Sequence, residues 1–292
     1  MPEVRDELAF ETKVVAEAGH TVESPADADP GRSGRARLSW LRIGVWLPPL
    51  IAFAIAIAVW EIYAHGHPHA IPTIRAIWDS LKGQPGVYWH NFLVTLREIA
   101  IGAGGGIVVA FLLAILMAEL PVFERALMPL AVMLMVTPVI AIAPALVTAF
   151  GFGLFPKYLL TGIVVFFPML VNSLAGLRSV DPRTLEVFTT LHANRWETFR
   201  YLRLPGSLPF VFAGLRISLP LAVVGATVAE FAAAGQQSGL GALIETAASV
   251  ADLPVIWGSI VILCALGVAF VVILGVIHRR VLWWDHSAEE RT

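Results

Sequence analysis

Long apolar runs, separated by short polar stretches, recur along the chain from residue 43 to residue 277. A helix that crosses about 30 Å of hydrocarbon needs roughly 20 mostly apolar residues, and the runs have this length. The run from Ala126 to Pro156 is longer than one helix needs, so we expect one span and a glycine-rich exit at Gly151-Phe152-Gly153. The pattern predicts an all-α membrane protein with about six spans. The expected spans are Ile43–Ile62, about Phe92–Ala118, one within Ala126–Pro156, Tyr158–Leu177, about Pro209–Ala234 and Leu253–Ile277.

Composition agrees with a membrane protein. Of the 292 residues, 57% are hydrophobic and 14% are charged, whereas a soluble domain carries about 25% charged residues. The formal net charge of −2 offers no broad basic patch, so we expect no nucleic-acid partner. Cys264, the single cysteine, cannot form an internal disulfide or a cysteine-based metal site.

The basic residues orient the predicted spans. Arginines precede the first span, lie between the fourth and fifth, and follow the sixth, and these three places face one side of a six-span protein. The positive-inside rule makes that side the cytoplasm, so both termini are expected there. We predict an acidic, disordered cytoplasmic tail over residues 1–42, a membrane domain over 43–282 and a cytoplasmic C-terminal tail over 283–292.

The segment 179–208, between the fourth and fifth spans, is too polar to cross a membrane. Asp181-Pro182 is typical of a helix start, with an Asp cap and proline at the first helical position. A first helix to about residue 191 is expected, then a turn, and a second helix capped by Asn194 with Glu197. The Leu-Pro pairs at 204–205 and 208–209 are expected to end the second helix. The result is a two-helix hairpin on the cytoplasmic face.

This segment resembles the EAA loop of the inner-membrane permeases of binding-protein-dependent ABC importers, in the nitrate/sulfonate/taurine branch. The chain departs from the family pattern at Val187 and Phe188, where the family has two alanines, and at His192, where it has a glycine that suits a left-handed helix end. The resemblance is carried by Glu186-Val187-Phe188, Leu191-His192-Ala193, Arg195-Trp196, Phe199, Leu204-Pro205, Ala213-Gly214-Leu215-Arg216, Ala229-Glu230-Phe231, Gly239-Leu240-Gly241, Thr95-Leu96-Arg97 with Gly102, Ala143-Pro144, Phe150-Gly151-Phe152-Gly153 and Lys157.

The resemblance implies that the hairpin is a coupling helix that docks on a separate nucleotide-binding subunit. In the alternative, its aromatic side chains only pack the hairpin against its own membrane core. The residues expected to couple to the ATPase are Glu186, Phe188, Leu191, His192, Ala193, Asn194, Arg195, Trp196 and Phe199.

The resemblance also implies the partners. They are a second permease copy (identical or related), two ABC ATPase subunits, an extracytoplasmic solute-binding protein and the lipid of the inner (plasma) membrane. The chain has no G-x-x-x-x-G-K-[ST] loop, so ATP and Mg are expected on the partner ATPase, and no cofactor, metal or enzymatic activity on this chain. The expected cargo is a nitrate-, sulfonate- or taurine-type anion or another small organic molecule. An ion-gradient-driven secondary transporter is the rival, although the central thirds of the spans lack the acids that such proteins usually carry.

Polar residues in the spans give further candidates. Arg97 and Glu230 are predicted to pair or to line an external vestibule, and snorkelling to the interface is the alternative. His65, His67 and His69 alternate in an external loop, where simple exposure is favoured over a metal site. Gly102 and Gly106 favour close helix packing. By family analogy, six polar residues are candidates for the translocation path: Thr137, Thr148, Asn172, Ser173, Ser218 and Thr227. In the alternative, each of these side chains bonds a backbone carbonyl of its own helix.

Overall fold

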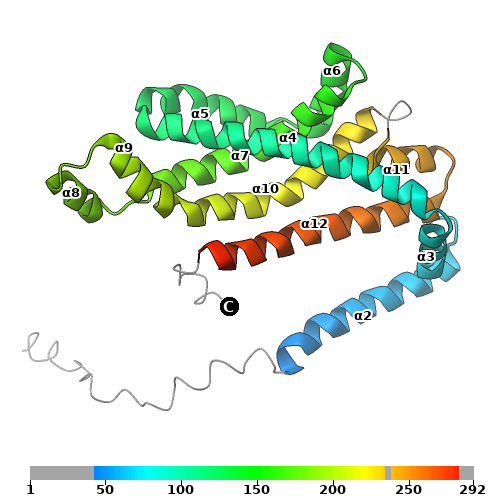
Figure 1. Cartoon of the computed structure of the whole chain (residues 1–292). Helices are drawn as coiled ribbons and strands as arrows, with labels where there is room; N and C mark the ends of the chain where they lie inside the picture. The colour runs from blue at the N-terminus through cyan, green and yellow to red at the C-terminus, as the bar shows by residue number, and fades with distance from the viewer. Residues whose placement is uncertain (1–42, 234–237, 283–292) are drawn as a thin grey trace, which may run out of the picture. The chain divides into compact units, whose positions relative to one another are not determined.

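The computed structural model describes residues 43–233 and 238–282, which form helices and no strand (Figure 1). The chain divides into two parts between Trp60 and Glu61. The helices are α2 (Ile43–Gly66), α3 (Ile74–Gly83), α4 (Pro85–Glu119), α5 (Pro121–Val136), α6 (Val139–Phe150), α7 (Leu154–Arg178), α8 (Pro182–Thr190), α9 (Arg195–Thr198), the π-helical turn η3 (Phe199–Arg203), α10 (Leu204–Ala232), α11 (Leu240–Ser249) and α12 (Leu253–Val281).

The first part contains most of α2, which contains the predicted first span. From Leu47 to Val59 its large apolar side chains are exposed, as lipid-facing residues of a membrane span would be. Pro48 and Pro49 lie within this helix, near its start.

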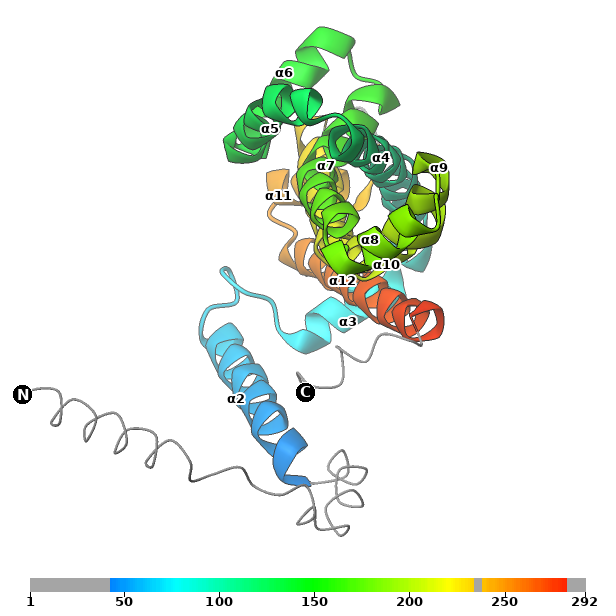
Figure 2. The ribbon, with the colours of Figure 1, turned by 90° about the vertical axis from the view of Figure 1, so that its left-hand side faces the viewer.

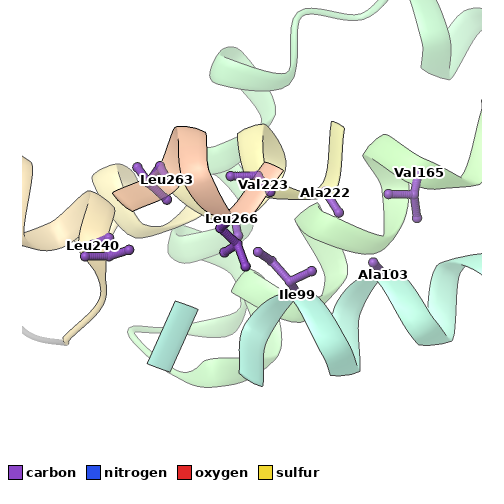
Figure 3. Close-up of a cluster of buried hydrophobic side chains, with 9 residues drawn as sticks. Ile99, Ala103, Val165, Ala222, Val223, Leu240, Leu263 and Leu266 are labelled. Atoms are coloured by element: carbon purple, nitrogen blue, oxygen red, sulfur yellow. The ribbon is translucent and has the colours of Figure 1, made fainter. Parts of the chain in front are cut away.

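The second part is built around α7. This helix packs along α4 on one side and along α10 on the other, and α12 packs against α10, α11 and α3 (Figures 1 and 2). One buried apolar cluster is built from side chains of α4, α7, α10, α11 and α12 (Figure 3). Its members are Ile99 and Ala103 of α4, Val165 of α7, Ala222, Val223 and Ala226 of α10, Leu240 of α11, and Leu263 and Leu266 of α12.

Small residues allow α4 and α7 to approach closely. A Cβ atom added to Gly102 would lie 2.7 Å from the carbonyl oxygen of Tyr158, and one added to Gly106 would lie 2.5 Å from that of Gly162. These contacts are with backbone, so no side-chain rotation could relieve them. The predicted packing role of Gly102 and Gly106 is confirmed, while Gly104 and Gly105 face open space.

The span prediction is confirmed. Within the described residues, five helices are long and apolar enough to cross a membrane, and a sixth span results if α5 and α6 are counted together. That pair is bent by 100°, so the predicted third span is two helices separated by Thr137-Pro138. Gly151 ends α6 with φ +80°, at the predicted glycine-rich exit.

Two features of the second part differ from the expectations. The short helices α3 and α11 were not predicted, because each has only 10 residues. The second helix of the hairpin does not end at the Leu-Pro pairs, because α9, η3 and α10 run on as one apolar helical segment from Arg195 to Ala232. Proline lacks an N–H and clashes with the carbonyl four residues back. The π-helical turn directly before Pro205 bonds Leu204 N to the Phe199 carbonyl, five residues back, and this wider turn accommodates the ring.

The two predicted tails, 1–42 and 283–292, lie outside the described residues.

Candidate functional site

The hairpin has the local structure that its sequence predicts. Asp181 caps α8 by accepting a hydrogen bond from Arg183 N at 3.0 Å. Asn194 Oδ1 accepts from Glu197 N at 2.9 Å, and Glu197 Oε2 accepts from Asn194 N at 2.8 Å, which completes the capping box of α9. Two reciprocal caps fix the corner between the short helices.

His192 adopts the left-handed conformation at this corner. Its φ is +55°, and the next residue, Ala193, donates its N–H back to the Phe188 carbonyl at 3.0 Å. A residue with a Cβ is strained in this region, and histidine tolerates it better than most. The backbone therefore keeps the helix end that a glycine would give.

The apolar side chains of the hairpin are mostly exposed. Leu191 is 71% exposed and Trp196 is 64% exposed, and Val187 of α8 is exposed as well. Phe188 is half-buried, and Phe199 packs partly against the buried cluster around Met169 and Leu170. The structure thus divides the predicted coupling residues: Phe199 anchors the hairpin to the membrane core, and Leu191 and Trp196 are exposed, although the Trp196 ring stacks on Phe199 with 5.8 Å between ring centroids.

Two ion pairs hold the hairpin at both of its ends. Arg178, just before it, donates to both carboxylate oxygens of Glu124 and also to the Met117 carbonyl at 3.3 Å. Arg203, at its far end, donates to Glu119 Oε1 at 2.8 Å. Both glutamates flank the turn between α4 and α5, so the hairpin is tied to that turn as well as to α7 and α10.

A buried polar cluster lies at the opposite end of α10. Glu98 of α4, Lys157 of α7 and Glu230 of α10 are each at most 1% exposed, and Lys157 Nζ donates to Glu98 Oε1 at 2.9 Å. Glu230 accepts from Thr95 Oγ1 at 2.7 Å and from Gly241 N.

The same cluster fastens the start of α11. Gly239 N donates to Asn91 Oδ1 at 2.8 Å, and Leu240 N donates to Thr95 Oγ1 at 2.9 Å. Lys157 Nζ also reaches the Ser238 carbonyl at 3.2 Å. The backbone at 238–241 is therefore bonded to side chains of both α4 and α7.

The predicted Arg97–Glu230 ion pair is wrong for the described residues. Glu230 is buried against Thr95 and Gly241, whereas Arg97 is exposed and has no carboxylate within ion-pair distance in the described part of the chain. Successive helix residues point about 100° apart, so Glu98, not Arg97, shares the inward face of α4 with Thr95. The sequence signal for this cluster was Thr95 and Glu98, three residues apart on one helix face, with Lys157 at the start of an apolar run.

The six predicted pathway residues are distributed over α6, α7, α10 and the C-terminal end of α5. Four of them donate to the carbonyl four residues back in the chain, which is the alternative that the sequence left open: Thr137, Thr148, Asn172 and Thr227. Ser218 instead donates to the Val165 carbonyl of α7 at 3.3 Å, and Ser173 is fully buried. A role for any of them in transport stays a prediction.

The histidines of the predicted external loop are not placed as a metal site. His65 Nδ1 and His67 Nδ1 bond the carbonyls of Glu61 and Tyr63, four residues back in each case. Within the described residues, no group of three or more histidine, cysteine or acidic side chains is placed to hold a metal ion.

Comparison with known proteins fits this arrangement of spans and hairpin. Residues 106–282 match the family model described as "Binding-protein-dependent transport system inner membrane component". The chain belongs to this family. The formylaminopyrimidine transport permease protein ThiX of Halalkalibacterium halodurans is 35% identical over 76% of this chain and 89% of its own length.

Other relatives are named for other solutes. The riboflavin transport system permease protein RibX of Chloroflexus aurantiacus is 31% identical over 86% of this chain and 93% of its own length. The putative aliphatic sulfonates transport permease protein SsuC of Bacillus subtilis is 28% identical over 93% of this chain and 98% of its own length. This chain is thus an ABC importer permease for a small solute and a transport component rather than an enzyme.

Proposed function

We propose that this permease couples ATP hydrolysis on two separate ABC ATPase subunits to alternating access across the inner membrane. Two permease copies, identical or related, would form the pathway, with both termini in the cytoplasm and an external binding protein delivering the solute. ATP and Mg would bind the ATPases, and this chain would need no cofactor of its own.

The observation that carries this proposal is the exposed apolar tip of the hairpin. Leu191 and Trp196 are large, exposed and held in place by the capping box and the ends of α8 and α9. Exposed aromatic and aliphatic anchors on a fixed scaffold are typical of the centre of a protein interface. The ion pairs of Arg178 and Arg203 would carry a displacement of the tip to the turn between α4 and α5.

The docking role can be tested with single charge insertions. We expect Leu191→Glu and Trp196→Glu to abolish co-purification with the ATPase while the permease remains folded, because an interface core does not tolerate an unpaired carboxylate. Val250→Glu is the matched control, since Val250 is 72% exposed in the turn after α11, beyond the opposite end of α10. ATPase retention by both hairpin variants would refute docking at this surface.

The cargo that we favour is a small nitrogen heterocycle rather than a sulfonate. Two relatives above 30% identity are named for formylaminopyrimidine and riboflavin, and two relatives named for aliphatic sulfonates and taurine are 28% identical. Proteoliposomes holding the permease, its ATPases and its binding protein should accumulate pyrimidine or flavin compounds only with internal MgATP. Uptake driven by an ion gradient without ATP would instead support the secondary-transporter alternative.

A further inference from the structure

The buried cluster at the far end of α10 is remote from the hairpin. Glu230 follows Leu204, the first residue of α10, by 26 positions, which corresponds to about 39 Å along a helix. Coupling to an ATPase therefore gives no reason for three ionisable side chains to be buried here. Such groups are expensive to bury and need a compensating partner.

The charges of the cluster do not balance if every group is ionised. Two carboxylates, Glu98 and Glu230, would share one ammonium group, that of Lys157. The Lys157 ammonium donates to Glu98 and to the Ser238 carbonyl, and it forms no bond to Glu230. One negative charge would remain in surroundings that α7, α10 and α12 make apolar.

No other charged group on the packed helices compensates for this surplus in the described part of the chain. Arg97 of α4 and Glu245 of α11 are exposed, and α12 contributes only the exposed thiol of Cys264 in its first half. Other titratable side chains lie on or at the ends of these helices. The Tyr88 hydroxyl of α4 bonds the Ser80 hydroxyl at 2.8 Å, Asp252 caps α12, and the Tyr158 hydroxyl of α7 is buried without a hydrogen-bond partner among the described residues.

The unpaired atom in the cluster is Glu98 Oε2. Both oxygens of Glu230 accept hydrogen bonds and Glu98 Oε1 accepts one from Lys157, but Glu98 Oε2 is buried and has no partner within the described residues. Glu98 lies one helical turn from Thr95, which itself bonds Glu230, so both carboxyl groups belong to the same buried cluster. A hydrogen on Glu98 Oε2 would make this oxygen a donor in place of an unpaired buried acceptor.

We propose that the buried cluster of Glu98, Lys157 and Glu230 binds one exchangeable proton, carried on Glu98 Oε2. With that proton the cluster has one carboxylate, one ammonium group and no net charge. The site lies outside the coupling machinery, and its ligand is the proton itself. It also fastens the backbone at 238–241, because Glu230 holds Gly241 N and Thr95 holds Leu240 N.

Loss of the proton has a defined direction. Without the proton, the folded protein buries two carboxylates against one ammonium group, whereas the unfolded chain exposes all three groups to water. An uncompensated buried charge is destabilising, so stability should fall over the alkaline range in which the proton leaves. The contacts at 238–241 should loosen over the same range.

Infrared spectroscopy of the full-length permease in lipid tests the proposal without its ATPase, binding protein or cargo. We expect the carbonyl stretch of a protonated carboxylic acid at neutral pH, shifted in D₂O and lost on alkalinisation. The band should be missing from Glu98→Gln and retained in Glu186→Gln, whose carboxylate is exposed on α8.

The glutamine variant gives a second measurement. The amide of Glu98→Gln replaces the protonated acid, so this variant should keep the neutral-pH melting temperature and lose the alkaline decrease of the wild type. If Glu98→Gln does not fold, the wild-type band and its titration still decide. A wild type without the band, or a band that Glu98→Gln leaves intact, overturns the proposal. Neither result bears on ATPase docking, which is measured separately.

Discussion

The close approach of α4 and α7 makes a quantitative prediction for Gly106→Ala. The added Cβ would lie 2.5 Å from the carbonyl oxygen of Gly162, 2.8 Å from its Cα and 2.9 Å from its carbonyl carbon. All three atoms belong to the backbone of α7, so the two helices must separate locally. Overpacking of this kind costs about 1–3 kcal/mol, occasionally more.

Gly105→Ala is the matched control. It adds the same methyl group one residue earlier in the same helix, where nothing lies within 4 Å. Both variants gain the same helix propensity, about 0.5–1 kcal/mol over glycine. The difference between them therefore isolates the packing term.

Thermal unfolding of the purified permease in detergent measures this difference. At roughly 2–4 °C per kcal/mol for a protein of this size, Gly106→Ala should melt about 2–12 °C below Gly105→Ala. Equal melting temperatures for the two variants, or a more stable Gly106→Ala, would refute the tight α4–α7 contact.

Three further substitutions test the polar cluster and the hairpin corner. Lys157→Met removes the ammonium group that pairs with Glu98 and should destabilise the protein by about 3–5 kcal/mol, measured by thermal unfolding. Its control is Lys82→Met, at an exposed lysine of α3, which should change the stability by less than about 1 kcal/mol. Gly239→Ala should also lower the melting temperature, because φ is +142° there and the new Cβ would overlap the Glu230 carboxylate. His192→Gly should raise it by relieving a left-handed residue, with a gain of up to about 1 kcal/mol. A lower melting temperature for His192→Gly would show that the imidazole has a structural contact of its own.

Local signals allowed the hairpin to be predicted almost residue by residue. The Asp181 cap and the Asn194–Glu197 capping box involve residues two or three positions apart, so their geometry depends little on the rest of the fold. The long apolar runs likewise identified the spans, because length and hydrophobicity alone decide whether a helix can cross lipid. The left-handed position at His192 followed from the place of a glycine in the family pattern.

Features that depend on distant residues could not be predicted. Lys157 and Glu98 are 59 positions apart, and only the packing of α4 on α7 brings them together. The Arg97–Glu230 prediction failed for the same reason. The sequence does not show which face of α4 turns inward, and that face carries Glu98 rather than its neighbour Arg97. The 100° bend in the third span falls at Thr137-Pro138, so the proline marks its place, but the sequence does not give its angle.

The continuity of the helical segment through Pro205 decides how movement can pass through this permease. Had the helix ended at the Leu-Pro pair, the hairpin could swing freely on its connection to the membrane domain. Instead the segment runs unbroken from Arg195 at the hairpin to Ala232 beside the buried cluster. At Gly176 and at Gly225, α7 and α10 approach so closely that an added Cβ would lie within 3.4 Å of the other helix. Closely packed helices resist sliding past one another, so a force on the hairpin should move α7 and α10 as one body.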